Sequence, residues 1–150
     1  MRCNEADVFT QIVLTIFRVN GRLLESGDKL VQPLNLTSAR WQVMGAIALA
    51  DKPLTAPQIA SAMGVTRQGV QKQVNALVLE GLLAQLPNPG NKRSPFITHS
   101  NIGIQVYARV ETLQADWANK LSTGLSGSDL QVTLRTLETV HKSLVDNFGG

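Results

Sequence analysis

Apolar residues recur at short, regular steps in the first part of the chain. Steps of three and four positions separate Val8, Ile12, Ile16, Val19 and Leu23. Because an α-helix completes a turn in about 3.6 residues, this spacing gathers the apolar side chains on one face. The pattern predicts an amphipathic helix over residues 5–24, which Gly27 interrupts, with Pro33 ending any short continuation.

The next segment carries the start and stop signals of two short helices. Thr37 or Ser38 caps the first, which runs to about residue 50. Thr55, followed three positions later by Gln58, matches the capping box of a second helix. A glycine at position 64 ends that helix and suits a sharp turn.

A third helix and two strands follow this turn. Thr66 caps a helix predicted over residues 66–80, and a glycine closes it. Residues 82–86 and 96–99 read as strands on either side of a segment rich in proline, asparagine and glycine. The order of a helix-turn-helix followed by a hairpin is that of a winged helix.

The last third of the chain returns to helical spacing. A first apolar series predicts a helix over residues 101–122 and consists of Ile102, Val106, Val110, Leu113, Trp117 and Leu121. A second predicts a helix over residues 127–147 and consists of Leu130, Leu134, Leu137, Leu144 and Phe148. Three long amphipathic helices carry more apolar surface than a small winged lobe covers, so we expect a second copy of the chain to cover the rest.

These elements predict a mainly α fold with a small β-wing. A winged helix-turn-helix over residues 36–99 forms the predicted DNA-binding region. Residues 1–35 and 100–150 form the predicted helical dimerisation region.

Charge is distributed unevenly along the chain, although its net value is only +3. Residues 55–95 hold four bases against one acid, Glu80, and so account for a net +3; the bases are Arg67, Lys72, Lys92 and Arg93. A basic middle within a nearly neutral scaffold is typical of a surface that faces a polyanion.

The predicted helix over residues 66–80 has two distinct faces. One is apolar and consists of Val70, Val74, Leu77 and Val78. The other offers hydroxyl, amide and basic groups and consists of Thr66, Arg67, Gln68, Gln71, Lys72 and Asn75. Asn and Gln can bond adenine, while Arg and Lys can bond guanine or phosphate, so this face suits a major groove. The alternative is an ordinary solvated face, but no acid occurs from residue 65 to residue 79.

The loop between the two predicted strands is the second candidate DNA contact. Asn91, Lys92 and Arg93 lie at its tip, within a wing predicted over residues 87–95. Basic groups there would reach the flanking minor groove or its phosphates. The alternative is a pair of solubilising charges on a loop.

Taken together, these motifs resemble the MarR family of multiple antibiotic resistance regulators. The resemblance runs from residue 36 to Gly103 and includes the segments Leu54–Ala60, Gly64–Arg67 and Glu80–Leu82. It implies a homodimer on a pseudo-palindromic operator in double-stranded DNA, regulated as a repressor that a small aromatic or amphipathic effector releases. The resemblance also adds Ser38 to the expected DNA contacts and suggests Trp41 and Met44 for an effector pocket.

Two positions depart from the family's pattern. The wing usually reads aspartate, any residue, arginine, whereas this chain has Asn91 in the first place, which offers only a neutral hydrogen bond to the arginine. The usual leucine-threonine pair that opens the next helix is His99-Ser100.

Three other side chains have competing interpretations. Cys3 is a redox sensor or an inert exposed thiol, and only Arg2 lies near enough in sequence to lower its pKa. His141 is a pH or metal sensor or, as we expect, a buried residue of the dimer interface. Trp41 and Trp117 line an effector pocket or pack in the core.

Several function classes find no support in the sequence. A single cysteine and two histidines leave no metal site, and no catalytic set or phosphate-binding glycine loop is present, so we expect no enzyme and no cofactor. No apolar run is long enough for a membrane span, and we expect a cytoplasmic protein.

The alternative to an operator-binding regulator is a weakly specific architectural or protein-interaction winged-helix module.

Overall fold

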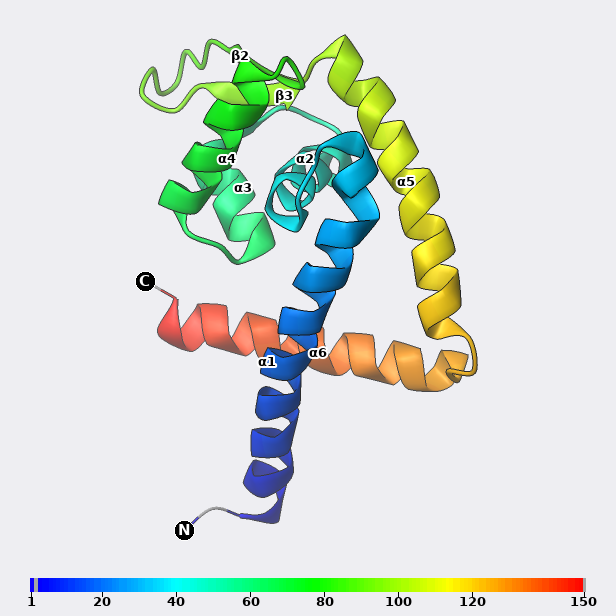
Figure 1. Cartoon of the computed structure of the whole chain (residues 1–150). Helices are drawn as coiled ribbons and strands as arrows, with labels where there is room; N and C mark the ends of the chain where they lie inside the picture. The colour runs from blue at the N-terminus through cyan, green and yellow to red at the C-terminus, as the bar shows by residue number, and fades with distance from the viewer. Residues whose placement is uncertain (2, 150) are drawn as a thin grey trace. The chain divides into compact units, whose positions relative to one another are not determined.

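The computed structural model describes residue 1 and residues 3–149, and it confirms a mainly α fold with a small sheet (Figure 1). The elements in chain order are α1 (Asn4–Val31), the 3₁₀ helix η1 (Gln32–Leu34), α2 (Ser38–Ala50), β1 (Leu54–Thr55), α3 (Ala56–Met63), α4 (Arg67–Leu79), β2 (Leu83–Leu86), β3 (Phe96–His99), α5 (Asn101–Ser122) and α6 (Gly127–Phe148). They form two compact units, Met1–Gln114 and Ala115–Gly150, and the boundary falls within α5. The predicted dimerisation and DNA-binding regions remain a prediction.

The caps that position the helix-turn-helix are the predicted ones. The Gln58 backbone amide donates to Thr55 Oγ1 at 3.3 Å, and the Thr55 amide donates to Gln58 Oε1 at 2.9 Å. Thr66 Oγ1 accepts from the Gly69 amide at 3.0 Å and so starts α4. Between the two helices Gly64 has a φ of +66°, a left-handed conformation that glycine adopts without strain. The sequence therefore sets both the ends of α3 and the start of α4.

The first helix differs from the prediction. α1 runs without interruption to Val31, so the expected break at Gly27 is wrong. Gly27 is buried, and a Cβ there would lie 2.4 Å from Ser38 Oγ. The glycine therefore serves the close approach of α2 to α1, a role that one-dimensional spacing does not reveal.

The sheet contains one strand that the pattern of residues did not predict. Its order is β1-β3-β2 with antiparallel pairing, and Leu54 pairs with Ile97 while Leu83 pairs with His99. β1 has only two residues, too few for an alternating pattern to be recognised. It joins the start of α3 to the base of the wing, so the wing and the helix-turn-helix share one sheet.

A single hydrophobic core supports the candidate DNA-binding face. Val70, Val74 and Leu77 of α4 are at most 1% exposed, which confirms the predicted inward face. Burial of an aliphatic side chain of this kind stabilises a fold by roughly 1.5–3 kcal/mol. α2 and α3 both pack against α4 (Figure 1). With one face of α4 held in this way, the opposite face is directed to solvent.

The start of α5 is fixed to the turn that follows α4. Ser100 Oγ donates to the Gly81 carbonyl at 2.6 Å and accepts from the Gly103 amide at 2.9 Å. The Ser100 amide donates to the Leu82 carbonyl at 3.0 Å. A serine thus does the capping at the position where the family usually has threonine.

In the second unit, α6 presents its apolar side chains to solvent. Ser126 caps the helix by accepting from the Asp129 amide at 3.4 Å. None of the described residues of α6 is buried. The exposed fractions are 43%, 52%, 39% and 53% for Leu130, Leu134, Leu137 and Leu144, and His141 on the same stripe is exposed as well.

A substitution at Gly103 tests how closely α5 packs against the turn that precedes β2. A Cβ at this position would lie 2.0 Å from the Leu82 carbonyl oxygen, a backbone atom that does not move freely. We expect Gly103→Ala to lower the free energy of unfolding by about 1–3 kcal/mol, because the backbone must shift to admit the methyl group. Urea unfolding followed by circular dichroism measures this change.

The matched control is the same substitution at Gly21. A Cβ there meets nothing within 4 Å, and the residue is in the interior of α1. Gly21→Ala should raise the free energy of unfolding by about 0.5–1 kcal/mol, since alanine loses less entropy in a helix. Equal effects of the two substitutions would contradict the close approach at Gly103.

Candidate nucleic-acid interface

The predicted polar face of α4 is exposed along its whole length. Its members are the cap and five side chains of the helix, all exposed: Thr66, Arg67, Gln68, Gln71, Lys72 and Asn75. We call this set the α4 face. It contains hydroxyl, amide and basic groups and no carboxylate, so each side chain can donate a hydrogen bond to an acceptor on DNA.

Two amides of the α4 face are hydrogen-bonded to each other. Gln71 Nε2 donates to Asn75 Oδ1 at 2.8 Å, between residues one helical turn apart. The bond leaves an acceptor on Gln71 and a donor on Asn75, which together match the donor and acceptor on the edge of adenine. The pair is therefore oriented before any partner arrives.

A groove of about 330 Å³ separates the start of α4 from the part of the wing loop that leads into β3. Arg67, Gln68 and Gln71 line one side, and Arg93 and Ser94 line the other. The structure thus brings together two basic residues that are 26 positions apart in the sequence. Two arginines across a groove are suited to phosphate, because the guanidinium group bonds it in a bidentate way.

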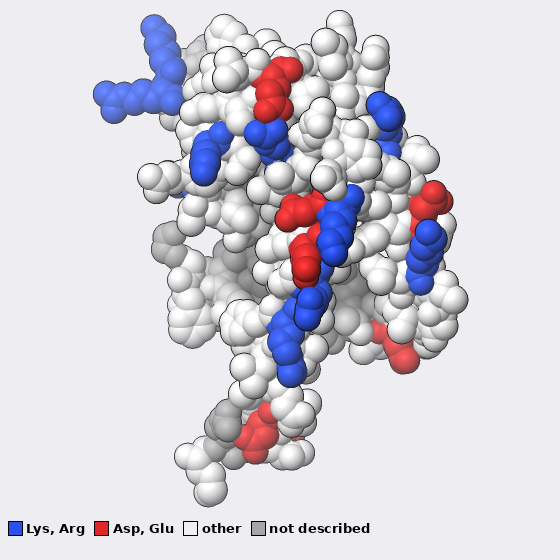
Figure 2. All heavy atoms as spheres, viewed as in Figure 1, with Lys and Arg blue, Asp and Glu red and all other residues white. Residues whose placement is uncertain are grey.

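The wing loop is shaped by two asparagines. Asn91 Oδ1 accepts from the backbone amide of Arg93 at 3.2 Å, so this side chain orders the turn through the backbone of the arginine. Asn88 Nδ2 donates to the Ser94 carbonyl at 2.8 Å and holds the two sides of the loop together. In Figure 2 basic side chains extend from the molecule at the edge where Figure 1 places the loop between β2 and β3. Lys92 and Arg93 are both exposed.

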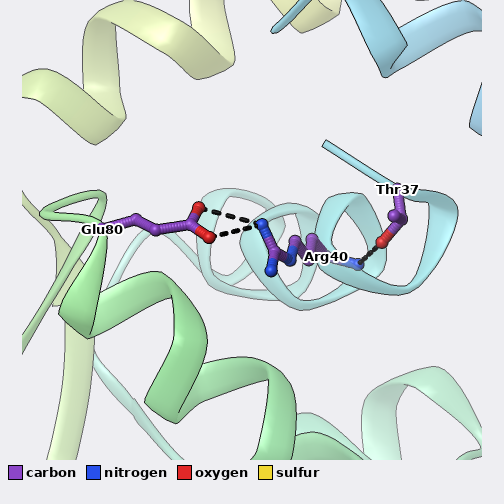
Figure 3. A network of polar contacts seen from close by, with 3 residues as sticks. All are labelled: Thr37, Arg40 and Glu80. Carbon is purple, nitrogen blue, oxygen red and sulfur yellow. Dashed lines mark hydrogen bonds and ion pairs between the residues drawn. The ribbon is translucent and has the colours of Figure 1, made fainter. Parts of the chain in front are cut away.

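The one acid of the basic region is paired with another helix. Arg40 Nη1 of α2 lies 2.7 and 2.9 Å from the two carboxylate oxygens of Glu80, and Thr37 Oγ1 accepts from the Arg40 amide (Figure 3). Among the described residues, none of the four bases of the region forms an ion pair within 4.0 Å. No ion pair within the described part of the chain therefore neutralises their positive charge. The sequence did not reveal the Arg40–Glu80 pair, because 40 positions separate the two residues.

Ser38 does not lie with the other candidate DNA contacts. It is only 6% exposed, and its hydroxyl donates to the Leu24 carbonyl at 2.7 Å. Its backbone amide donates to Asp28 Oδ1 at 2.7 Å. The side chain ties α2 to α1, so the expectation that Ser38 contacts DNA is corrected: its hydroxyl is directed into the protein.

A second hollow of about 510 Å³ lies between α2, β3 and the start of α5, and we call it the α2–α5 cavity. Its wall includes Ile47, Asp51, Lys52, His99, Tyr107 and Glu111. The residues suggested for an effector pocket are not part of this wall. Met44 is fully buried in the core, and Trp41 is half-buried. Both reach the wall from behind, because Trp41 interacts with the Tyr107 hydroxyl and the Met44 carbonyl accepts a hydrogen bond from His99.

His99 and Tyr107 are the aromatic members of this wall. His99 Nε2 is 2.9 Å from the Met44 carbonyl oxygen, to which it donates. The two rings meet edge to face with centroids 5.4 Å apart. Burial, followed by the negative charge of Glu111, raises the pKa of the Tyr107 hydroxyl, while the bond from Trp41 acts in the opposite direction.

Other kinds of site receive no support from the described residues. Within residues 1 and 3–149, no three histidine, cysteine or acidic side chains are grouped so as to hold a metal ion. No helix in the described part of the chain combines the length and apolar content of a membrane span. Cys3 is a free, exposed cysteine.

The sequence and the fold of the chain are both similar to those of known proteins. The sequence model of the MarR family matches residues 34–94, which contain α2 to β2 and the wing. An uncharacterised protein of Mycobacterium tuberculosis is 33% identical over 132 residues, covering 88% of this chain and 91% of the relative.

Solved structures show the same fold. A MarR-family transcriptional regulator from Rhodococcus sp. RHA1 matches with a TM-score of 0.77 and 17% identity over 94% of this chain and 96% of that one. A MarR mutant from E. coli in complex with operator DNA matches with a TM-score of 0.72 and 22% identity over 91% and 96%. BpsR of Bordetella bronchiseptica, whose DNA binding is regulated by 6-hydroxynicotinic acid, matches with a TM-score of 0.76 and 16% identity over 87% and 98%. At identities this low the likeness shows the fold.

The α4 face can be tested at two of its residues. We expect Gln71→Ala and Lys72→Ala each to weaken binding to the chain's DNA site by about 1–3 kcal/mol, because each removes a donor from the exposed face. If Lys72 contacts phosphate, its substitution also reduces the slope of log affinity against log salt by about 1. Fluorescence anisotropy over a salt series measures both quantities.

Lys120→Ala serves as the control, because Lys120 is an exposed helical lysine outside the α4 face and the wing. It should bind DNA like the unmodified protein. Wild-type affinity and salt slope in both α4 variants would show that DNA does not use this face.

Proposed function

The chain belongs to the MarR family of transcription regulators, and from this premise we propose that it works as a homodimer that binds a pseudo-palindromic operator in double-stranded DNA. In this proposal α4 enters the major groove and the wing over residues 87–95 contacts the flanking minor groove. The contacts come from the α4 face together with Asn91, Lys92 and Arg93. Since it acts on DNA, we also propose the cytoplasm as its location.

One observation carries the proposal. An exposed helix face without acids lies beside a wing arginine, across a groove of about 330 Å³, and the bases there have no ion-pair partner among the described residues. Unpaired charge attracts phosphate and releases counterions, while the amides of Gln71 and Asn75 supply hydrogen bonds that depend on the base sequence. The combination favours an operator-binding regulator over a module that binds DNA without specificity.

The dimer is supported by apolar surface that a single chain leaves uncovered. α6 has no buried residue within the described chain. α1 exposes a further set of large apolar side chains: Val8, Phe9, Ile12, Leu14, Ile16, Phe17, Val19, Leu23 and Leu24. Each of the two helices thus carries an exposed apolar stripe, which is rare in monomeric proteins, and a second copy would cover both stripes. A dimer also presents the α4 face twice, which matches a site with two half-sites.

We also propose that the protein represses transcription and that binding of an effector relieves this repression. The α2–α5 cavity lies beside β3, the strand that leads out of the wing, so a molecule bound there is adjacent to an element of the DNA-contacting region. Suppose that the wing has two arrangements, one of which binds DNA better. A ligand that binds one arrangement more tightly than the other shifts the balance between them, and the affinity for DNA changes by as much as the ligand's two affinities differ.

Binding to the DNA upstream of the protein's own gene provides the direct test. We expect a gel shift at about 100 mM salt, with an affinity at least about 10³-fold above that for unrelated DNA of equal length. A ratio near one, with binding that salt abolishes, would identify the weakly specific architectural module instead. The absence of any binding would refute the proposed function.

The oligomeric state provides an independent test. Light scattering on the eluting protein should give twice the 16.2 kDa of one chain. Leu137→Glu should shift the molecule toward monomer, since a charge replaces an apolar side chain on the α6 stripe. Thr139→Glu, on the opposite side of the same helix, is the control and should remain dimeric. A stable monomer of the unmodified chain would contradict the proposal.

A further inference from the structure

We propose that the α2–α5 cavity binds a small aromatic molecule that carries a positive charge. The inference rests on the proposed function, because such a molecule would be the effector of the regulator. It adds the chemical class of the ligand and the residues that select it. The charges, the hydrogen-bonding groups and the apolar surfaces of the cavity wall all match a ligand of this class.

The charges on the wall favour a cation. Asp51 and Glu111 contribute two carboxylates, and Lys52 contributes one ammonium group, so the wall has a net charge of −1. The Tyr107 hydroxyl adds no negative charge at physiological pH, because its ordinary pKa is about 10 and burial and Glu111 raise it further. A ligand carboxylate would meet two like charges there, while a ligand ammonium would meet them as partners.

The polar atoms of the wall favour a ligand that donates hydrogen bonds. His99 donates Nε2–H to the Met44 carbonyl, so in the neutral ring Nδ1 is the acceptor. The carboxylates of Asp51 and Glu111 add further acceptors. The Tyr107 hydroxyl adds one donor to the wall.

The apolar side chains and aromatic rings of the cavity wall suit a ligand with a flat aromatic ring. Ile47, Pro53 and Ile104 line the cavity together with the rings of His99 and Tyr107. A volume of about 510 Å³ lies within the range of small-molecule sites. An aromatic ring can pack on these surfaces, and a cation near the face of an aromatic ring is attracted to it.

The cavity wall is linked to the DNA-contacting region through His99. This residue ends β3, which pairs with both β1 and β2 and follows directly from the wing. Its ring is held by α2 through the Met44 carbonyl and contacts Tyr107 of α5. A ligand between these elements therefore touches the strand that positions Arg93.

Three probes with the same phenol ring and different charge test the inference. They are tyramine, which is a cation, 4-ethylphenol, which is neutral, and 3-(4-hydroxyphenyl)propionate, which is an anion. Isothermal titration calorimetry on the full-length protein measures each affinity. We expect tyramine to bind most tightly and at least about 10-fold more tightly than the anion, since the wall has a net negative charge.

Substitution of Glu111 tests which charge of the cavity wall selects a cationic ligand. Glu111→Gln keeps the size of the side chain and removes its charge, and it should narrow the preference for tyramine over the anion by about 5-fold or more. Glu138→Gln, an exposed acid on α6, is the control and should leave the preference unchanged. Circular dichroism verifies that both variants are folded.

Two results would overturn the inference. One is an anion that binds as tightly as tyramine, and the other is the absence of binding by all three probes at millimolar concentration. Operator binding is measured on the same preparation. A protein that binds its operator and none of the probes refutes the ligand class alone, whereas a protein that binds no DNA refutes the proposed function.

Discussion

Burial of one side of α4 is the constraint on which the rest of the structure depends. Val70, Val74 and Leu77 are enclosed by α2 and α3, and their burial fixes the rotation of the helix about its axis. Because side chains of a helix diverge from one axis, the α4 face must then point to solvent. The cap at Thr66 and the left-handed Gly64 set where the helix begins, so both its register and its direction are determined.

The position of the wing is fixed by the same lobe, but through the β-sheet instead of through helix packing. β3 lies between β1, which precedes α3, and β2, which follows α4. The sheet therefore ties the base of the wing to both helices of the helix-turn-helix. Close contacts of Ser100 and Gly103 with the turn at Gly81 and Leu82 then attach α5 to the same point. The departure from the family at His99-Ser100 thus retains a cap and adds a histidine link to α2.

Local signals explain how much was predictable from the sequence. Capping residues, left-handed glycines and apolar periodicity act within a few positions, and they correctly predicted α3, α4, β2, β3, α5 and α6 to within about two residues. The same signals failed at Gly27, where the glycine serves contact with Ser38 rather than a helix break. They also missed β1, which exists only because β3 pairs with it.

In the candidate site, too, some features follow from local sequence signals and others only from the tertiary structure. The sequence by itself determined the composition of the α4 face and of the wing, because the spacing of residues on a helix decides which side chains share a face. Only the tertiary structure decided that Arg67 and Arg93 share a groove, that Glu80 is paired with Arg40, and that Ser38 is buried. It also decided that Trp41 and Met44 lie behind a cavity instead of lining it. Each of these facts joins residues distant in the chain, and the packing of whole elements, not local propensity, brings such residues together.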